Sequence, residues 1–147
     1  MALRYPSVWI VATATPPDVI AAWETPDTED RLRRGRVQPE RRYALSIRSY
    51  PTLADVPLAW TANVRPRTID EFFTQVPTVA AQGERTLGGR RWQEYIANPG
   101  GQYYALLTEH RGRIYVVAFE RTWTKARFEA TTWERQTLET LALTDPE

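Results

Sequence analysis

Short apolar and alternating runs, separated by turn-forming residues, divide most of the chain into predicted β-strands. Tyr43 to Arg48 alternates apolar and polar side chains, which is the period of a half-buried strand. Ile114 to Phe119 is almost entirely apolar, as expected of a central strand that is covered on both faces. Residues 19–24 also allow a helical turn after Pro17, but we favour a strand. The remaining predicted strands are residues 8–13, 84–87, 91–96 and 103–109.

A helix is predicted from Thr68 to Val76. Thr68 and Glu71 have the spacing of a capping box, in which Thr68 accepts from the backbone N–H of Glu71 and Glu71 reaches back. Pro77 ends the helix because proline cannot continue it. The apolar side chains that share one face are Ile69, Phe72, Phe73 and Val76.

A second helix is predicted to begin near Thr131 and Thr132. Thr131 and Glu134 repeat the capping-box spacing, and an apolar stripe follows at three- and four-residue steps. Between Thr52 and Ala62 we expect one helical turn around residues 53–55 and otherwise irregular chain. The stripe of the second helix consists of Leu138, Leu141 and Ala142.

Tight turns link the strands of the second half. Gly88 and Gly89 can adopt the positive φ angles of a two-residue hairpin turn, and residues 98–101 and 110–113 are also turn-like. Strands joined by short turns pair antiparallel, so this half is predicted to be a meander. We therefore predict an α+β fold with a mainly antiparallel sheet flanked by helices.

Composition agrees with one soluble globular domain over residues 1–147. The chain is 42% hydrophobic and 25% charged, it has no cysteine, and its net charge is +1. The absence of cysteine excludes disulfides, thiolate metal sites and a cysteine nucleophile. No apolar run reaches the length that crosses a bilayer. Neither the compartment nor the oligomeric state can be read from the sequence.

A set of segments along the chain has a familiar order. They are YPSVW at residues 5–9, the strand at 43–47, the helix around 71–73, the hairpin at 87–90, the meander at 102–119 and the terminal helix. This order resembles the PsbP-like superfamily, which includes the extrinsic photosystem II protein PsbP, bacterial relatives and a Ran-binding import factor. The resemblance implies an α/β/α sandwich and a non-enzymatic role in docking to a larger assembly. The metal-binding histidines of plant members have no counterpart here, and no Ran-contacting residue carries over.

An arginine-rich surface loop is predicted at residues 25–42. Lys125 is the only lysine among 19 lysine and arginine residues, so guanidinium groups carry nearly all of the positive charge. Such groups can bind an acidic protein, nucleic acid or anionic lipid, although Asp27, Glu29 and Asp30 can also pair with them inside a solvated loop. The candidate binding residues are Arg31, Arg33, Arg34, Arg36, Arg41 and Arg42.

Aromatic residues of the meander form a second candidate surface. Trp92, Tyr104 and Trp123 lie on or beside adjacent predicted strands. Any of these rings that is exposed near an arginine can stack on a ligand, whereas rings that face the other layer pack in the core.

The sequence offers little for catalysis. His110 is the only histidine, so it cannot form a multi-histidine metal site, and no phosphate-binding glycine loop is present. We predict no cofactor, no metal and no catalytic residue. The expected function is a protein-binding accessory domain. The alternatives are a small enzyme that uses a carboxylate pair such as Glu94 and Glu109 in an aromatic-lined pocket, and nucleic-acid or anion binding through the arginine-rich loop.

Overall fold

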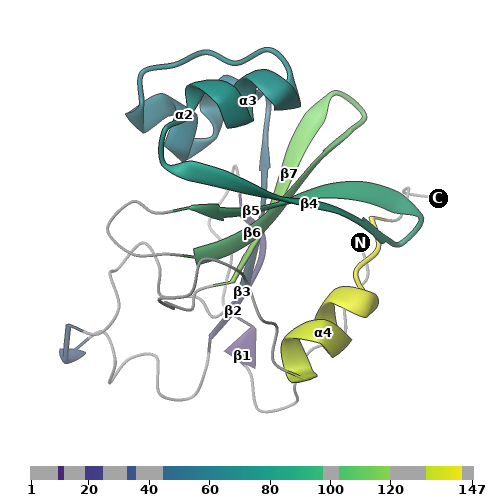
Figure 1. Cartoon of the computed structure of the whole chain (residues 1–147). Helices are drawn as coiled ribbons and strands as arrows, with labels where there is room; N and C mark the ends of the chain where they lie inside the picture. The colour runs from purple at the N-terminus through teal and green to yellow at the C-terminus, as the bar shows by residue number, and fades with distance from the viewer. Residues whose placement is uncertain are drawn as a thin grey trace.

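A seven-stranded antiparallel sheet organises the chain, in the spatial order β1-β2-β3-β7-β6-β5-β4 (Figure 1). The structure is a computed structural model that describes residues 10–11, 19–24, 33–35, 45–97, 103–119 and 132–143. The strands are β1 (Ile10–Val11), β2 (Val19–Glu24), β3 (Leu45–Tyr50), β4 (Val79–Leu87), β5 (Arg90–Ala97), β6 (Tyr103–His110) and β7 (Arg113–Phe119).

Within the part of the chain that the structure describes, four short helical elements with defined bounds accompany the sheet. Within the described ranges no helix has the length and apolarity needed to cross a membrane. The helical elements are η2 (Leu53–Asp55), α2 (Pro57–Thr61), α3 (Ile69–Gln75) and α4 (Thr132–Glu139).

The register shows how the two halves of the chain join. β4 to β7 form the predicted meander, in which each strand pairs with the next one along the chain. β3 then pairs with β7, and Leu45 lies opposite Phe119. This pairing places β7 inside the sheet, as its apolar sequence predicts.

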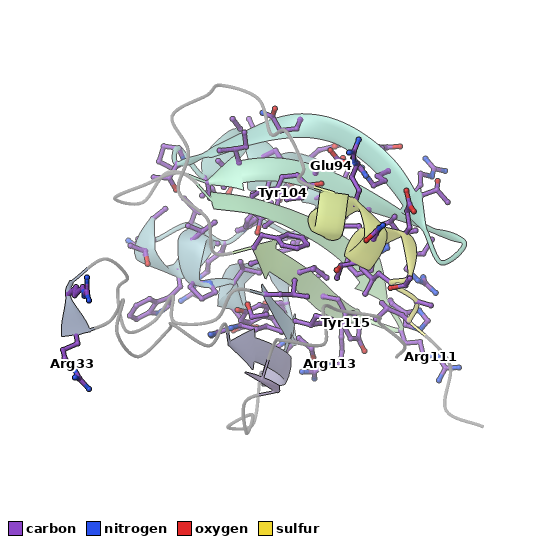
Figure 2. The ribbon with its side chains drawn as sticks, turned by 90° about the horizontal axis from the view of Figure 1, so that it is seen from below. Arg33, Glu94, Tyr104, Arg111, Arg113 and Tyr115 are labelled. Atoms are coloured by element: carbon purple, nitrogen blue, oxygen red, sulfur yellow. The ribbon has the colours of Figure 1, made fainter. Side chains whose placement is uncertain are left out.

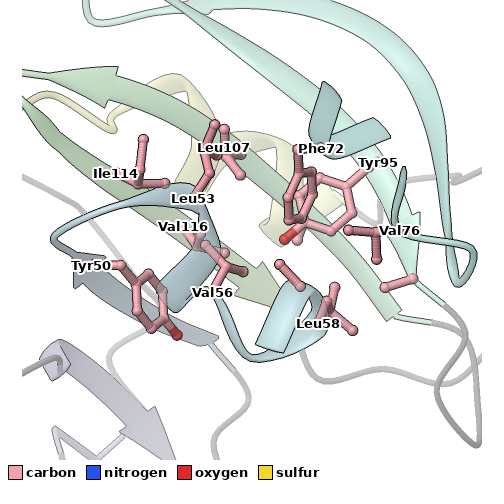
Figure 3. Packing of buried hydrophobic residues seen from close by; sticks show 13 residues of the cluster. Tyr50, Leu53, Val56, Leu58, Phe72, Val76, Tyr95, Leu107, Ile114 and Val116 are labelled. Atoms are coloured by element: carbon pink, nitrogen blue, oxygen red, sulfur yellow. The ribbon is translucent and has the colours of Figure 1, made fainter. Parts of the chain in front are cut away.

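Two hydrophobic clusters use the two faces of the sheet, because successive side chains of a strand point to opposite sides. In β6, Leu106 belongs to the cluster that contains Leu138 and Leu141 from the α4 region. The next residue, Leu107, belongs to the cluster that contains Phe72 of α3, together with residues of η2 and α2 (Figure 3). We call these the α4 face and the α3 face.

The hairpin between β4 and β5 has the predicted glycine turn. Leu87 pairs with Arg90. The two residues that join them, Gly88 and Gly89, have φ angles of 57° and 73°. Such angles fit the type I′ turn, whose twist matches that of the adjoining strands. Gly88 also lies against the chain that follows α4, close to the backbone of Leu141 and Ala142.

Most predicted elements are present, with two differences. The strand at Val19–Glu24 is confirmed, and the helical turn at 53–55 is a 3₁₀ turn. The expectation of irregular chain up to Ala62 is wrong, since α2 occupies Pro57–Thr61. β4 begins at Val79 and not near Glu84, because pairing with β5 extends it through residues of low strand propensity. The predicted turn at 98–101 and the cap at Thr131 lie outside the described residues.

Candidate functional site

Trp60 has the most unusual exposure on the described surface. Its side chain is 74% exposed, and no other large hydrophobic residue among the described ones is exposed to this degree. An exposed tryptophan carries a large apolar area that is left in contact with water. The helix that holds Trp60 is therefore the starting point of the candidate site.

Helix α2 fixes the position of Trp60. Proline at the first helical position is pre-organised for a helix, and Pro57 begins α2. Leu58 and Ala59 are buried beneath the helix in the α3-face cluster. These two contacts hold the opposite side of α2 against the sheet, so Trp60 faces outward.

The end of α2 is a Schellman motif. Asn63 N–H donates to Trp60 O at 3.0 Å, and Val64 N–H donates to Ala59 O at 3.1 Å. Asn63 has a φ of 55°, the left-handed conformation that this motif requires and that asparagine tolerates. Val64 packs against the α3-face cluster, which anchors the chain just after the turn.

The Asn63 turn gives a direct stability test. Asn63→Ala is expected to lower the free energy of unfolding by about 1 kcal/mol, because alanine is strained at this φ. Asn63→Gly is the matched control and should leave stability equal or slightly higher. Urea denaturation of both variants measures the difference. An alanine variant as stable as the glycine variant would contradict the left-handed turn.

Two exposed arginines follow Trp60. Arg65 and Arg67 flank Pro66, which is buried. Arg67 N–H donates to Glu71 Oε2 at 2.7 Å, and Thr68 Oγ1 accepts from Glu71 N–H at 3.1 Å. The forward bond of the predicted capping box is therefore confirmed, while Glu71 reaches the residue before the cap and not Thr68 itself. This bond fixes the backbone of the arginine segment.

We define the Trp60 surface as Trp60, Asn63, Arg65 and Arg67. All four residues are exposed, and the Schellman motif, buried Pro66 and the Glu71 bond hold their backbone. Within the described part of the chain, neither guanidinium group forms an ion pair. The surface thus combines one large apolar side chain with two positive charges that are available to a partner.

The arginine-rich loop is described only in part. Arg33 and Arg34 are exposed, and Arg33 lies far from Arg111 and Arg113 at the other side of the molecule (Figure 2). The structure therefore does not bring the described loop arginines together with those of the β6–β7 turn. The other candidates, Arg31, Arg36, Arg41, Arg42 and Trp123, lie outside the described residues.

Trp92 and Tyr104 are core residues and offer no exposed stacking surface. Their side chains are 1% and 0% exposed, and both belong to the α4-face cluster. Strand alternation turns both rings towards this cluster, and Tyr104 lies 6.0 Å from Phe119 between ring centroids. Packing accounts for their position, which removes them from the candidate surface.

The carboxylate pair of the enzyme alternative does not converge. Glu94 shares the α4 face with Trp92, two residues before it in β5, whereas Glu109 shares the α3 face with Leu107 of β6. The sheet itself lies between the two carboxylates, so they cannot act on one substrate. Within the described ranges, no group of three or more potential metal-ligating side chains forms.

Glu94 has a structural partner instead. It forms an ion pair with Arg85 of the neighbouring strand β4. The pair lies on the α4 face of the sheet, opposite to the face that α3 covers. Partial burial alone would lower the pKa of Arg85, but the hydrogen bond to Glu94 and the charges of Tyr104, Glu94 and Glu139 outweigh it. The pKa of Arg85 is therefore raised, and the guanidinium stays charged.

Sequence reasoning missed Trp60. The signal was present in Pro57 at a helix start and Asn63 at a helix end, but five residues are too few to display an amphipathic repeat. Comparison with known proteins adds no further guide, since no family model matches the chain and no curated protein matches it significantly.

Proposed function

We propose that this chain is a non-enzymatic, protein-binding accessory domain that docks an acidic partner through the Trp60 surface. The observation that carries the proposal is the 74% exposure of Trp60 on a helix whose two ends and underside are fixed. The proposal includes the α/β/α sandwich and the docking role that the resemblance to PsbP-like proteins implies.

The composition of the Trp60 surface supports a protein partner. Tryptophan and arginine are the residues enriched where a few side chains supply most of the binding energy of an interface. A pre-positioned tryptophan loses little conformational freedom on binding, because its backbone is already ordered. Exposing it costs solubility, so a partner that covers it gives a physical reason for its position.

The charge of the surface supports an acidic partner. Arg65 and Arg67 lie within seven residues of Trp60 and have no ion-pair partner among the described residues. Two acids on the same segment are engaged locally, since Asp55 accepts from Thr52 at 2.9 Å and Glu71 accepts from Arg67 N–H, while a third acid, Asp70, is exposed three residues after Arg67. Carboxylates of a partner can therefore form charge-assisted bonds at the rim of the tryptophan contact.

The test compares capture of partners by the full chain and by matched variants. Trp60→Ala is expected to weaken binding of the captured partner by about 30-fold, the effect of losing about 2 kcal/mol at a central contact. Thr61→Ala, an exposed neighbour on the same helix, is the control and should bind normally. Arg65→Glu should weaken binding and reduce its salt dependence.

The proposal fails if the full chain retains no stoichiometric partner, or if Trp60→Ala binds that partner as well as Thr61→Ala does. Thermal unfolding of each variant separates lost binding from lost folding. Trp60 is exposed, so its replacement should change stability by less than about 0.5 kcal/mol.

A further inference from the structure

A polar strip crosses the α4 face near the β6–β7 turn. Tyr115 of β7 pairs with Ser49 of β3 on one side and with Thr108 of β6 on the other. The next pair on this face towards the turn is His110 and Arg113. Residues that pair directly across antiparallel strands project on the same face, so these five side chains lie side by side on three rigid strands.

Arg113 has a fixed orientation. Its Nε donates to Ser49 Oγ at 2.7 Å, and Ser49 is only 5% exposed. Figure 2 shows Arg113 and Tyr115 next to each other on β7. Because Nε is already bonded, the two terminal nitrogens of the guanidinium remain to bind a further acceptor.

Arg113 also lacks a counter-ion among the described residues. The side chain is half-buried, and in the part of the chain that the structure describes it forms no ion pair. Glu94 is the carboxylate on this face of β5, and it is paired with Arg85. Glu109 projects on the α3 face. A half-buried charge is unfavourable unless an opposite charge compensates it.

The surroundings add positive potential and donors. Arg90 lies on the α4 face, because it alternates with Trp92 and pairs with Leu87, a member of the α4-face cluster. The ring of His110 lies 6.1 Å from that of Tyr115 between centroids. Hydroxyl groups of Ser49 and Tyr115 can each donate a hydrogen bond.

We propose that Arg113, Ser49, Tyr115 and His110 form a binding site for a small phosphate-class oxyanion. The terminal nitrogens of Arg113 bind two oxygens, and hydroxyl donors of the strip bind the others. This site is separate from the Trp60 surface and does not depend on the proposed function.

The donor set favours phosphate over a carboxylate. A carboxylate has two oxygens in one plane, which the two terminal nitrogens of Arg113 alone can satisfy. Phosphate has more acceptor oxygens, directed tetrahedrally, and up to two negative charges. Donors that come from β3 and β7 at once, beside Arg90 and His110, match the larger and more highly charged ion.

The experiment titrates the full chain with inorganic phosphate at low ionic strength and follows backbone amide shifts by NMR. Saturable shifts are expected at residues 49 and 113–115. Arg113→Gln should weaken phosphate binding at least about tenfold, since the fork of charge-assisted bonds is lost. Ser49→Ala should weaken it by a smaller factor, because the guanidinium is no longer held.

Arg91→Gln is the matched control, because it removes the same charge from a side chain that is 78% exposed. It should change the phosphate affinity by less than about twofold, as expected for a screened surface charge. Arg113→Lys serves if Arg113→Gln does not fold, and it should also weaken binding because the fork is absent.

Three results would overturn the site. The first is the absence of saturable phosphate binding to the unmodified chain. The second is an equal loss of affinity in the Arg91 and Arg113 variants, which would indicate diffuse attraction. The third is acetate binding as strongly as phosphate, which would indicate a carboxylate site.

Discussion

Phe72→Ala is expected to lower the free energy of unfolding by about 3–5 kcal/mol, the range for removing a fully buried aromatic side chain. The ring of Phe72 is 0% exposed and packs edge-on against Phe73 and Tyr95, with centroid distances of 5.4 and 6.1 Å. It connects α3 to the middle of β5, so no neighbouring group can fill the space without moving the helix. Urea denaturation followed by tryptophan fluorescence measures the loss.

Phe73→Ala is the matched control. Phe73 is adjacent and is also in contact with Tyr95, at 5.7 Å between centroids, but it is only partly buried. Phe73→Ala should therefore lower the free energy of unfolding clearly less than Phe72→Ala does. Equal losses would contradict the assignment of Phe72 to the centre of the α3-face cluster and of Phe73 to its edge.

Gly88→Ala should produce the second large effect. It is expected to lower the free energy of unfolding by about 3 kcal/mol, because backbone strain at positive φ and overpacking both act at this position. Gly88 has a φ of 57°, and an added Cβ would lie 2.7 Å from Leu141 O and 2.8 Å from Ala142 Cα. Both of these are backbone atoms, so the methyl group can be accommodated only if the chain after α4 shifts away from the hairpin.

Gly89→Ala separates the two causes. Gly89 has a similar φ of 73°, but nothing lies within 4 Å of an added Cβ. The free energy of unfolding of this variant should therefore fall only by the cost of the backbone strain, about 1–2 kcal/mol. The difference between the two melting curves gives the cost of displacing the segment around Leu141. Equal losses of stability in the two variants would mean that the segment around Leu141 does not pack closely against Gly88.

Local signals predicted most of the sheet. The glycine pair at 88–89 identified the hairpin, alternation identified β3, and the continuous apolar run identified β7 as a central strand. These features are visible because each depends on a few neighbouring residues and on the two-residue period of a strand. The spacing of Thr68 and Glu71 located the start of α3 for the same reason.

The candidate sites depend on information that the sequence does not display. Trp60 could be recognised only after α2 was known to bury Leu58 and Ala59, because exposure is decided by tertiary packing. The contact between Arg113 and Ser49 joins residues 64 positions apart, and only the β3–β7 register brings them together. The arginine-rich loop was predicted as a binding site from its local density of charge. Such a density does not show how the side chains are arranged in space.

The strand order has a consequence for the timing of synthesis. β3 takes its place in the sheet beside β7, which is the last of the described strands to be made, and β1 and β2 attach through β3. β1 to β3 can pair with one another as they emerge, and so can β4 to β7, but the free edge of β3 has no partner until β7 is made, so the two groups join only through this non-local pairing. Such non-local closure is slow compared with hairpin formation. A nascent chain stopped before residue 113 should consequently expose its early strands to chaperones and proteases, and one that extends beyond residue 119 should protect them.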